Sequence, residues 1–403
     1  MSEAAARSRQ VLIAGGGIAG LCAALAFSAC GIAVRLFERA EQPHEIGAGL
    51  QLSPNATRIL DHLGVLHRLR GAALQPEAVV LRGSSSMAEI ARVPLGRQGE
   101  ERWGAPYLVV HRADLHAALL SVAKQASDAE IVAGATVRDA AAHGSGVTVS
   151  VDLGGKVREF GGQMMVIADG VWSSNRRLVG SVQSAYSGRI AWRATLRADA
   201  ATNQIARDCV TAFLHPNAHL IAYPIRGGQS INLAAFAKGA APENKWSAER
   251  QPAALLDAFA SANPAIIALL SQAGPWTVWP IHTVDVGSPW VNEAGFAVIG
   301  DAAHAMTPFA AQGAAMAIED AFTLAACVAA QPGVIEVALR SYERARRARV
   351  QAVARRGRLN EFAWHASGPV GIARNQFLKL RGPDRLAADM DWLYGWAPPG
   401  ISR

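Results

Sequence analysis

Apolar and small residues near the start of the chain form two runs of different length. Residues 11–14 (VLIA) are a short apolar run, three glycines follow, and residues 18–30 continue with apolar and small residues and no charge. The short run fits a buried strand of a parallel sheet, and the longer run fits a helix that packs closely on that sheet. A second strand is predicted at residues 34–39 (VRLFER). The pattern therefore predicts a strand, a tight turn, a helix and a second strand of one parallel sheet.

Later stretches predict a second kind of sheet. Strands separated by turns are expected at about 77–110 and 184–286, where segments such as INLAAF alternate in character, before an apolar strand (FAVIG) returns the chain to the first sheet. We therefore predict an α/β fold, in which a Rossmann-like doubly wound domain carries an inserted α+β domain with a mostly antiparallel sheet, followed by a C-terminal helix. The first domain is assigned residues 1–75, 105–183 and 287–366, the inserted domain 76–104 and 184–286, and a tail that packs on the body 367–403. Residues 1–8 are expected to be a disordered start.

The first turn carries the spacing of a dinucleotide-binding loop. Gly15, Gly17 and Gly20 form a GxGxxG pattern between the predicted strand and helix, which lets the backbone approach a pyrophosphate at the helix N-terminus. Glu38, followed by Arg39, lies 18 residues after Gly20, where an acid can bind ribose hydroxyls. The alternative is a glycine-rich buried turn without a ligand. The strand, helix and acid at the right spacing favour dinucleotide binding.

A second ligand-binding turn is predicted near residue 300. Asp301 follows the strand FAVIG, where its carboxylate can accept hydrogen bonds from sugar hydroxyls. Beyond it, residues 308–313 (PFAAQG) precede a helix whose free N–H groups and dipole would face an anionic group. The residues expected at this turn are Pro308, Gln312, Gly313 and Ala314.

These motifs, in this order, resemble those of the group A FAD-dependent aromatic hydroxylases, the family of salicylate, 3-hydroxybenzoate and 6-hydroxynicotinate hydroxylases. Asp169, before Gly170, resembles the family's DG motif, and Arg112 stands where the family places an arginine near the flavin pyrophosphate. As bland alternatives, Asp-Gly is a common turn and Arg112 a surface arginine at a helix start. The resemblance runs from about residue 9 to residue 396.

The resemblance implies a tightly bound, non-covalent FAD and a transient NADH or NADPH, because the sequence has no second GxGxxG for a stable pyridine-nucleotide domain. It also implies that reduced FAD reacts with O2 to give the C4a-hydroperoxide, which hydroxylates a small aromatic or N-heteroaromatic substrate. Other outcomes are N-hydroxylation of an aromatic amine or decarboxylative hydroxylation. An FAD-binding isomerase or regulator is the non-oxygenase alternative.

The segment HLIAYPIRGG resembles the family's active-site strand, and the resemblance assigns catalytic roles to His219 and Tyr223. Both lie on one strand face because their separation is even. A histidine can accept a phenolic proton, and a tyrosine can hold a carboxylate or hydroxyl. Both could instead be core residues with satisfied polar groups. His282, or Gln51 through a water, are the other candidates for the base.

The substrate pocket departs from the family at one position. Several relatives have a histidine after the proline of the flavin loop, whereas this chain has Phe309, which makes the cavity more apolar. An anionic substrate then needs a partner such as Gln51, Arg189 or Arg193, because an unpaired buried carboxylate is costly. Arg193 is expected to be structural. Trp192, Trp276 and Trp279 are candidates for the lining, with at most one expected there.

Composition fits a two-domain cytoplasmic enzyme. The 403 residues, 51% hydrophobic, can bury a large core, and the four cysteines have no metal-ligand spacing, so we expect reduced thiols and no metal. The formal charge of +7 owes much to one arginine-rich segment without aromatic or base-reading pattern, so no nucleic-acid partner is expected. The uncharged run at residues 11–34, which ends at Arg35, resembles a membrane segment, but its glycine spacing favours a buried turn. A monomer or homodimer is expected.

Overall fold

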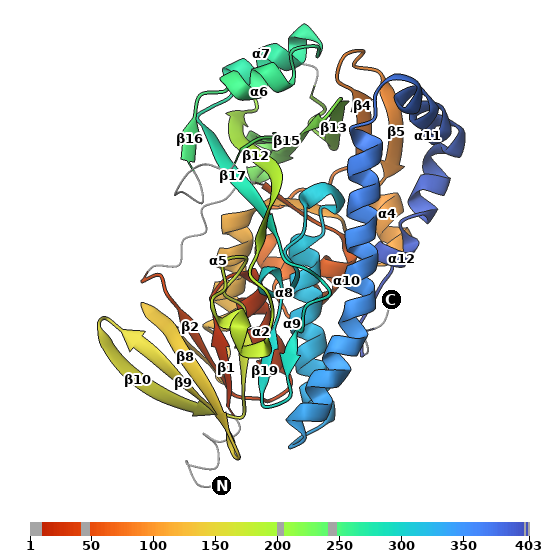
Figure 1. The fold of residues 1–403 in the computed structure, drawn as a ribbon. Helices are drawn as coiled ribbons and strands as arrows, with labels where there is room; N and C mark the ends of the chain where they lie inside the picture. Colours follow the sequence, from red (N-terminus) through yellow and green to blue (C-terminus); the bar gives the residue numbers. More distant parts are fainter. Residues whose placement is uncertain (1–9, 42–48, 200–204, 241–247, 399, 402–403) are drawn as a thin grey trace.

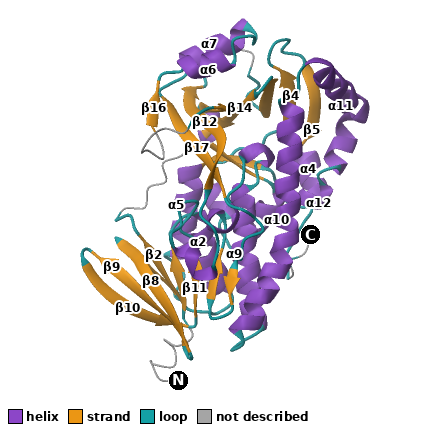
Figure 2. Ribbon diagram, in the orientation of Figure 1, coloured by secondary structure: helices purple, strands orange, loops and turns teal. Residues whose placement is uncertain are grey.

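The computed structural model describes residues 10–41, 49–199, 205–240, 248–398 and 400–401. The predicted disordered start, residues 1–8, lies outside them. Within the described part of the chain, two large sheets face each other across the middle of the molecule, and a long helix runs along one side of both (Figures 1 and 2).

The first large sheet has the order β18-β19-β11-β1-β2-β7. Its neighbours pair in parallel except β18 and β19, which are antiparallel. Its strands are β1 (Val11–Ala14), β2 (Val34–Glu38), β7 (Ala129–Ala133), β11 (Met164–Ile167), β18 (Val291–Asn292) and β19 (Phe296–Val298). The central strand β1 is continuously buried, as the unbroken apolar run predicts.

Different layers cover the two faces of this sheet. On one face, α2 (Ile18–Ala29) packs against α5 (Arg112–Ala123) and α9 (Gly313–Ala330). The other face carries an antiparallel sheet of β8 (Ala135–His143), β9 (Gly146–Leu153) and β10 (Lys156–Gly162), seen at the lower left of Figure 1. Val147, Val149 and Val151 of β9 are fully buried. The α/β class is confirmed. In a doubly wound fold helices cover both faces of the parallel sheet, whereas here the three-stranded sheet covers one of them.

The second large sheet has the order β16-β17-β12-β15-β14-β13-β4-β5 and is antiparallel except for the β4–β13 pair. Its strands are β4 (Ala78–Gly83), β5 (Glu89–Pro94), β12 (Ala185–Arg197), β13 (Cys209–His215), β14 (Ala218–Ile225), β15 (Ser230–Lys238), β16 (Ala248–Arg250) and β17 (Trp276–Thr283). One face is buried under α6 (Ala253–Ala258) and α7 (Pro264–Gln272). The other face looks toward the first sheet. These sheets follow the predicted division of the chain, although the domain boundaries themselves stay a prediction.

Shorter elements join the two sheets. β3 (Gly49–Leu52) pairs with β6 (Leu108–His111), and β6 lies against β14. The connecting helices are α3 (Pro54–His62) and α4 (Gly96–Trp103). Gly49 also donates its backbone N–H to Asn232 Oδ1 at 2.6 Å, which ties β3 to β15. This hydrogen bond joins the connecting strand pair to the second large sheet.

The C-terminal segment is more helical than its sequence suggests. α10 (Ile335–Trp364) is the predicted C-terminal helix, but residues 368–388, which fall in the predicted tail, form α11 (Gly368–Ala388), followed by α12 (Asp391–Tyr394). The proline of the GP pair stands in the first turn of α11, where its missing N–H costs nothing, and Gly382 with φ of 69° forms a kink before Pro383. α11 packs on β5, so the segment does lie on the body as expected.

A buried ionic network fixes α9, α10 and the turn between β19 and α8 (Asp301–His304). Arg346 donates to Glu319 at 2.5 Å and to Asp320 at 2.8 Å, and His304 Nε2 lies 2.5 Å from Asp320. The backbone N–H of Gly300 also donates to Asp320. These side chains are essentially inaccessible to solvent, so the charges are paired inside the protein.

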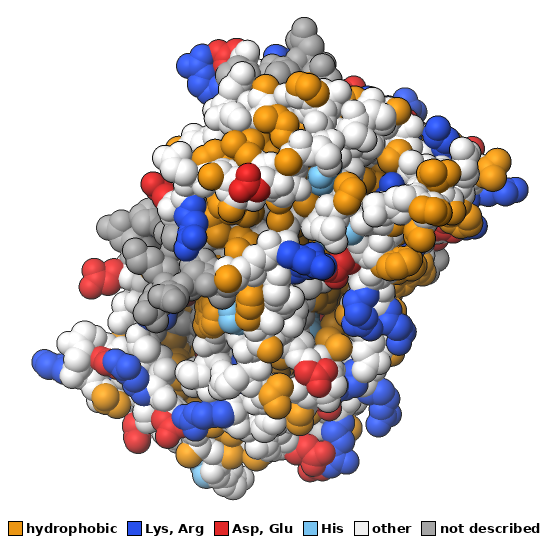
Figure 3. Space-filling model, turned by 45° about the horizontal axis from the view of Figure 1, so that its top comes forward, with side chains coloured by type: hydrophobic (Ala, Val, Ile, Leu, Met, Phe, Trp, Pro, Cys, Tyr) orange, Lys and Arg blue, Asp and Glu red, His pale blue; other side chains and the backbone are white. Residues whose placement is uncertain are grey.

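Helix α9 is the one helix of the described residues that is long and apolar enough to cross a membrane by length and composition. It packs against α2, α3 and α10, and most of its residues are buried within the molecule. Core packing therefore accounts for its composition. On the face shown in Figure 3, Lys and Arg side chains are interspersed with Asp and Glu.

Candidate active site

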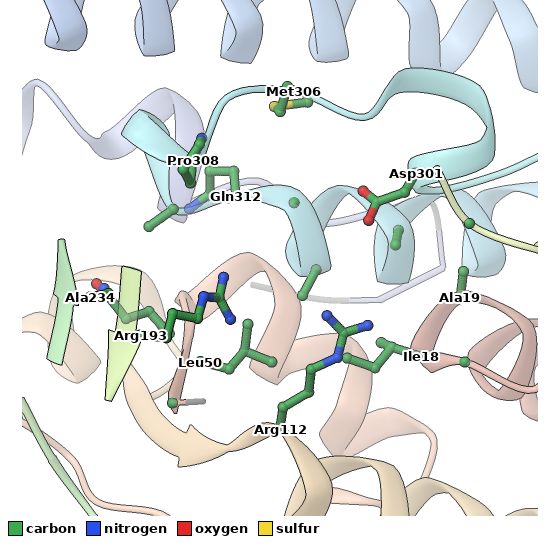
Figure 4. A pocket seen from close by; sticks show the side chains of 18 of the residues that line it. Ile18, Ala19, Leu50, Arg112, Arg193, Ala234, Asp301, Met306, Pro308 and Gln312 are labelled. Atoms are coloured by element: carbon green, nitrogen blue, oxygen red, sulfur yellow. The ribbon is translucent and has the colours of Figure 1, made fainter. Parts of the chain in front are cut away.

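Two adjoining cavities of about 290 and 540 Å³ lie between the two large sheets. They open at the carboxyl ends of β1, β11 and β19, the edge at which open parallel sheets bind ligands. Figure 4 shows Arg112, Arg193 and Leu50 on one side, with Asp301, Gln312 and Pro308 opposite them. The residues shared by both linings include Gly17, Arg112, Arg193, Phe236, Asp301 and Met306.

The glycine turn after β1 fits a ligand at its backbone. Gly15 has φ of 104°, and a Cβ there would lie 2.5 Å from the Ala168 carbonyl oxygen. A Cβ on Gly20 would lie 1.9 Å from the Gly15 carbonyl oxygen, so the turn and α2 can approach only because both residues are glycine. Gly17 is the N-cap of α2 and has no side chain to cap the helix, and it lines both cavities. The first N–H groups of α2 therefore face the cavity side of the turn.

The acid after β2 lies beside this turn. Glu38 accepts the N–H of Gly16 at 2.6 Å and the N–H of Ala40 at 2.8 Å, which fixes its carboxylate. Glu38 and Arg39 both line the larger cavity. The sequence-predicted ribose acid is thus brought within the same cavity as the glycine turn.

Helix α5 contributes two basic side chains. Arg112 is its first residue and lines both cavities. His116, one turn later, lies 2.7 Å from the Gly16 carbonyl oxygen through Nε2 and lines the larger cavity. Sequence reasoning missed His116, although its spacing of four residues from Arg112 places both on one helix face.

The predicted DG motif also lies in the larger cavity. Asp169 Oδ2 accepts a hydrogen bond from Asn175 at 2.9 Å, whereas its buried Oδ1 has no partner among the described residues. Burial raises the pKa of this carboxyl. Arg176 holds the loop by donating to the carbonyl oxygens of Gly170 and Val171. A buried oxygen without a partner indicates that a ligand completes this site.

The turn before α9 forms the opposite wall. Asp301 is exposed and starts α8, and it lines both cavities. Gln312, Gly313 and Ala314 line the smaller cavity at the start of α9, where no side chain of the described residues caps the helix. Gln312 Nε2 donates to Ser53 Oγ at 2.9 Å, so its side chain fixes the loop. The N–H groups of this helix start therefore remain available to a ligand.

Taken together, these groups fit FAD. The cavities offer two free helix N-termini, a carboxylate at the ribose position, cationic side chains and an unpartnered buried oxygen. Such groups suit a pyrophosphate and sugar hydroxyls. The residues that would hold the cofactor are Gly15, Gly17, Glu38, Arg39, Arg112, Asp169, Asp301, Pro308, Gln312, Gly313 and Ala314.

The inserted sheet closes the smaller cavity with one face of β14 and β15. Ile221, Tyr223, Ala234 and Phe236 line it, all from that face. Burial raises the pKa of Tyr223 above its ordinary range, so its hydroxyl is protonated and can donate. Gln51 also lines the cavity, and its Oε1 accepts the Tyr107 hydroxyl at 2.7 Å. The end beside the FAD groups is therefore a mainly apolar chamber with a few polar side chains.

Arg193 is a cation that sequence reasoning undervalued. Its side chain extends into the space between the two walls (Figure 4), and it lines both cavities. Its Nε is buried without a hydrogen-bond partner among the described residues. Burial lowers the pKa of Arg193, and the nearby Arg112 acts in the same direction. An anion in the cavity would pair with the unpartnered Nε and stabilise the charged form of Arg193. The structure therefore places Arg193 at the ligand cavity, whereas a structural role was expected.

The predicted tryptophans divide between the two faces of the sheet. Trp192 and Trp276 are buried on the far face, in the core with α6 and α7, so the expectation that Trp192 lines the pocket is corrected. Strand alternation explains this, because Ala191 and Arg193 on either side of Trp192 line the larger cavity. Trp279 lines that cavity instead.

His219 lies on the same face of β14 as Tyr223 but beyond the cavity lining. It is fully buried, stacked on Phe236 at 4.8 Å between ring centroids and beside Phe309 at 5.2 Å. Phe309 is also buried and does not line either cavity. The structure thus places Tyr223 in the lining of the smaller cavity. His219 lies behind Phe236, outside that lining, and its role as base stays a prediction.

Comparison with known proteins agrees with this site. A family described as FAD binding domain matches residues 8–357. The 3-hydroxybenzoate 6-hydroxylase of Polaromonas naphthalenivorans is 32% identical over 386 residues, covering 96% of both chains. The 3-amino-4-hydroxybenzoate 2-monooxygenase of Streptomyces cremeus is 33% identical over 391 residues, covering 96% of this chain and 95% of that one. A variant of HpxO from Klebsiella pneumoniae complexed with FAD has a TM-score of 0.83 and 25% identity, covering 96% and 98% of the chains.

Proposed function

The chain belongs to the FAD-dependent aromatic hydroxylases, and from this premise we propose that it uses NAD(P)H and O2 to hydroxylate a small aromatic acid that carries a phenolic hydroxyl. The substrate class is inferred from the smaller cavity, whose lining is mainly apolar and includes Arg193. Its apolar side chains suit a planar ring, and a half-buried arginine suits a carboxylate. Two relatives whose names specify hydroxybenzoates support this class.

The division of labour follows from the site. When bound, FAD supplies the oxygen chemistry, with electrons from NAD(P)H. The protein orients the ring and excludes water: Ile221, Ala234 and Phe236 form apolar walls, and Arg193 holds the acid group. Tyr223 donates a hydrogen bond from its protonated hydroxyl to an oxygen of the substrate.

His219 is proposed as the base that takes the phenolic proton. Burial, followed by His365 and Arg189, lowers the pKa of His219 well below its ordinary value, so the ring is neutral near pH 7 and has one unprotonated ring nitrogen. Its strand face continues the wall formed by Tyr223 and Ile221. In His219→Ala, FAD content and reduction by NAD(P)H should persist while NAD(P)H consumption yields hydrogen peroxide instead of hydroxylated product. Unchanged product per NAD(P)H would return His219 to a core role.

A screen of aromatic acids tests the substrate class. Purified, FAD-loaded protein is mixed with NADH or NADPH and with 3-hydroxybenzoate, 3-amino-4-hydroxybenzoate or 6-hydroxynicotinate, each beside its carboxamide analogue. The proposal expects one or more acids to accelerate NAD(P)H oxidation and to gain one oxygen atom by mass. Equal stimulation by acid and amide would contradict the role given to the carboxylate.

We also propose a cytoplasmic location and a monomeric or homodimeric state. The four cysteines are free in the structure, as in a reducing compartment. Light scattering of the purified protein gives the native mass, and a tetramer would contradict this proposal.

A further inference from the structure

The side of α11 that faces the body of the protein is largely polar. Arg374 donates to the last backbone carbonyl groups of α10 and, through Nε, to Asn375 Oδ1 at 2.8 Å. Arg381 forms an ion pair with Asp389, just beyond the end of the helix. These side chains are partly buried, and Leu378 is the large apolar residue on the same side. Polar contacts therefore provide much of the attachment of α11 to the body.

The side of α11 that faces solvent is apolar. Val370, Ile372, Phe377 and Leu380 are 51%, 64%, 59% and 83% exposed. With 3.6 residues per turn, all four fall in the half of the helix opposite Gly371, which is buried. A surface helix ordinarily turns its apolar side to the core, so α11 has the reverse arrangement. Its outer side is therefore suited to contact an apolar partner.

The last turns of α10 extend this apolar surface. Leu359 and Phe362 are 58% and 69% exposed. α11 runs back beside these turns, because Arg374 bonds to the end of α10 and Arg356 of α10 lies 3.8 Å from the Met390 sulfur (Figure 1). Figure 3 shows hydrophobic side chains gathered at the upper right, where α11 lies. The apolar ridge formed by the two helices consists of Leu359, Phe362, Val370, Ile372, Phe377 and Leu380. A group of large apolar side chains on the surface indicates a contact site.

Cations surround the apolar ridge. Residues 355–388 contain seven Lys and Arg but two carboxylates, so this segment has a net positive charge. The exposed cations that form no ion pair with other described residues are Arg355, Arg358, Lys379 and Arg385. Of the two carboxylates, Glu361 is engaged by Arg189 at 2.6 Å, and Asp384 is exposed. The cations on α10 stand one turn before Leu359 and Phe362, and therefore on the same helix face.

This charge favours an anionic lipid surface over a second copy of the chain. Two copies that met at the apolar ridge would bring the unpaired cations of both together, and like charges across an interface oppose association. A bilayer accepts apolar side chains at the boundary of its acyl chains, and its anionic head groups attract Lys and Arg. The ridge also projects from the molecule: Leu380 is its most exposed residue, and neither cavity described above is lined by a ridge residue.

We propose that α11 and the last turns of α10 bind the surface of an anionic phospholipid bilayer. The apolar ridge inserts at the boundary of head groups and acyl chains, roughly 5–10 Å deep as for other interfacial helices. The four unpaired cations lie at the level of the head-group phosphates. The binding is peripheral, so α9 keeps its place in the core. Because the ridge lies apart from both cavities, this contact positions the enzyme at a membrane without taking part in the reaction.

Sedimentation with vesicles tests the proposal. FAD-loaded protein is mixed with vesicles of phosphatidylcholine alone, or of phosphatidylcholine and phosphatidylglycerol. We expect binding to the anionic vesicles that weakens as salt rises, because the screening length falls to about 3 Å at 1 M. Leu380→Glu should weaken binding about 10- to 100-fold, the change expected for loss of one buried leucine. Lys379→Gln should weaken it about fivefold. Val157→Glu, at a 64% exposed apolar position on β10, is the matched control with wild-type binding.

A second measurement reports insertion directly. A polarity-sensitive dye on Leu380→Cys, in a Cys30→Ser background, should shift to the spectrum of an apolar environment when anionic vesicles are added, whereas the same dye on Val157→Cys should not. All variants should keep the wild-type FAD content, and no aromatic acid is needed, so the result is independent of the proposed substrate.

Equal binding of the wild type to neutral and anionic vesicles would overturn the proposal, as would no binding at low salt or wild-type binding by Leu380→Glu. A dimer in light scattering that Leu380→Glu converts to a monomer would assign the apolar ridge to a second copy of the chain instead.

Discussion

Asp301 shows how much one side chain at the edge of the cavity contributes. It is exposed, starts α8 and faces the start of α9. In Asp301→Ala, we expect FAD to bind about 10- to 100-fold more weakly, because a hydrogen bond to a charged group contributes about 1.5 to 3 kcal/mol. Fluorescence titration of the apoprotein with FAD measures this. Asp139→Ala, on β8 of the three-stranded sheet, is the control. Equal FAD affinity in both variants would show that the Asp301 carboxylate does not contact the cofactor.

Arg193 is expected to decide which aromatic compounds bind. In Arg193→Met the side chain keeps most of its apolar length but loses the charge, so the KM for 3-hydroxybenzoate should rise about 10- to 100-fold, in line with the loss of a charge-assisted hydrogen bond. The KM for 3-hydroxybenzamide should change little. A parallel rise for acid and amide would show that Arg193 shapes the chamber without holding the carboxylate.

The cofactor residues were predictable from the sequence because they follow strand ends at fixed spacings. Gly15, Glu38, Asp169 and Asp301 each lie at the end of a strand of one sheet or within three residues after it, so the fold brings them to one edge. The ligand-facing position of Arg193 was not predictable in this way, although the residue was a candidate. That position depends on how the inserted sheet packs on the first sheet, and the local sequence carries no signal of that packing.

At the scale of elements, Asp320 joins α9, α10 and the turn that carries Asp301. Burial alone would raise the pKa of Asp320, but His304 and Arg346 hold it at about 2. An unfolded aspartate titrates near about 3.9, so this interaction stabilises the fold above that pH and is lost as the pH falls from about 4 to about 2. The free energy of unfolding should decrease by about 2 kcal/mol across this range.

Asp320→Asn checks this account. Removing one partner of a buried ion pair should lower the free energy of unfolding by about 3 to 5 kcal/mol at pH 7 and flatten its dependence between pH 4 and pH 2. Urea unfolding at several pH values measures both effects. Asp139→Asn removes a carboxylate that pairs with Arg177 at the surface, and should cost less than about 1 kcal/mol. A loss as small as that control would contradict the bracing role of Asp320.

Element types were predicted best where the hydrophobic pattern was long or bounded by glycine. The strand, turn and helix at residues 11–29 and the C-terminal helix were predicted, whereas α11 falls in the segment that was expected to be a tail. Its Pro and Gly residues suggested breaks. The first proline instead occupies the first turn, whereas Gly382, with φ of 69°, does interrupt the helix before Pro383. The place of a proline or glycine within a helix therefore decides whether it interrupts the helix.

At the scale of the whole molecule, FAD should strengthen the association of the two large sheets. The cavities draw on Gly17 and Asp301 of one part and Tyr223 and Phe236 of the other, so a bound cofactor contacts both. Purified protein should be yellow with non-covalent FAD, and FAD at about 1,000 times its Kd should raise the free energy of unfolding by about 4 kcal/mol. Thermal unfolding with and without FAD measures the effect. Stabilisation by FMN or NAD to the same extent would contradict the cofactor assignment.

Under the proposed function, this chain transfers one oxygen atom from O2 to a phenolic aromatic acid. The most direct measurement is the mass of the product formed under isotopically labelled O2 by FAD-loaded protein supplied with NAD(P)H and the acids of the screen. We expect a hydroxylated acid that carries one labelled oxygen atom and forms in step with NAD(P)H consumption. A product whose new oxygen comes from water would contradict it, as would NAD(P)H consumption that yields only hydrogen peroxide with every acid.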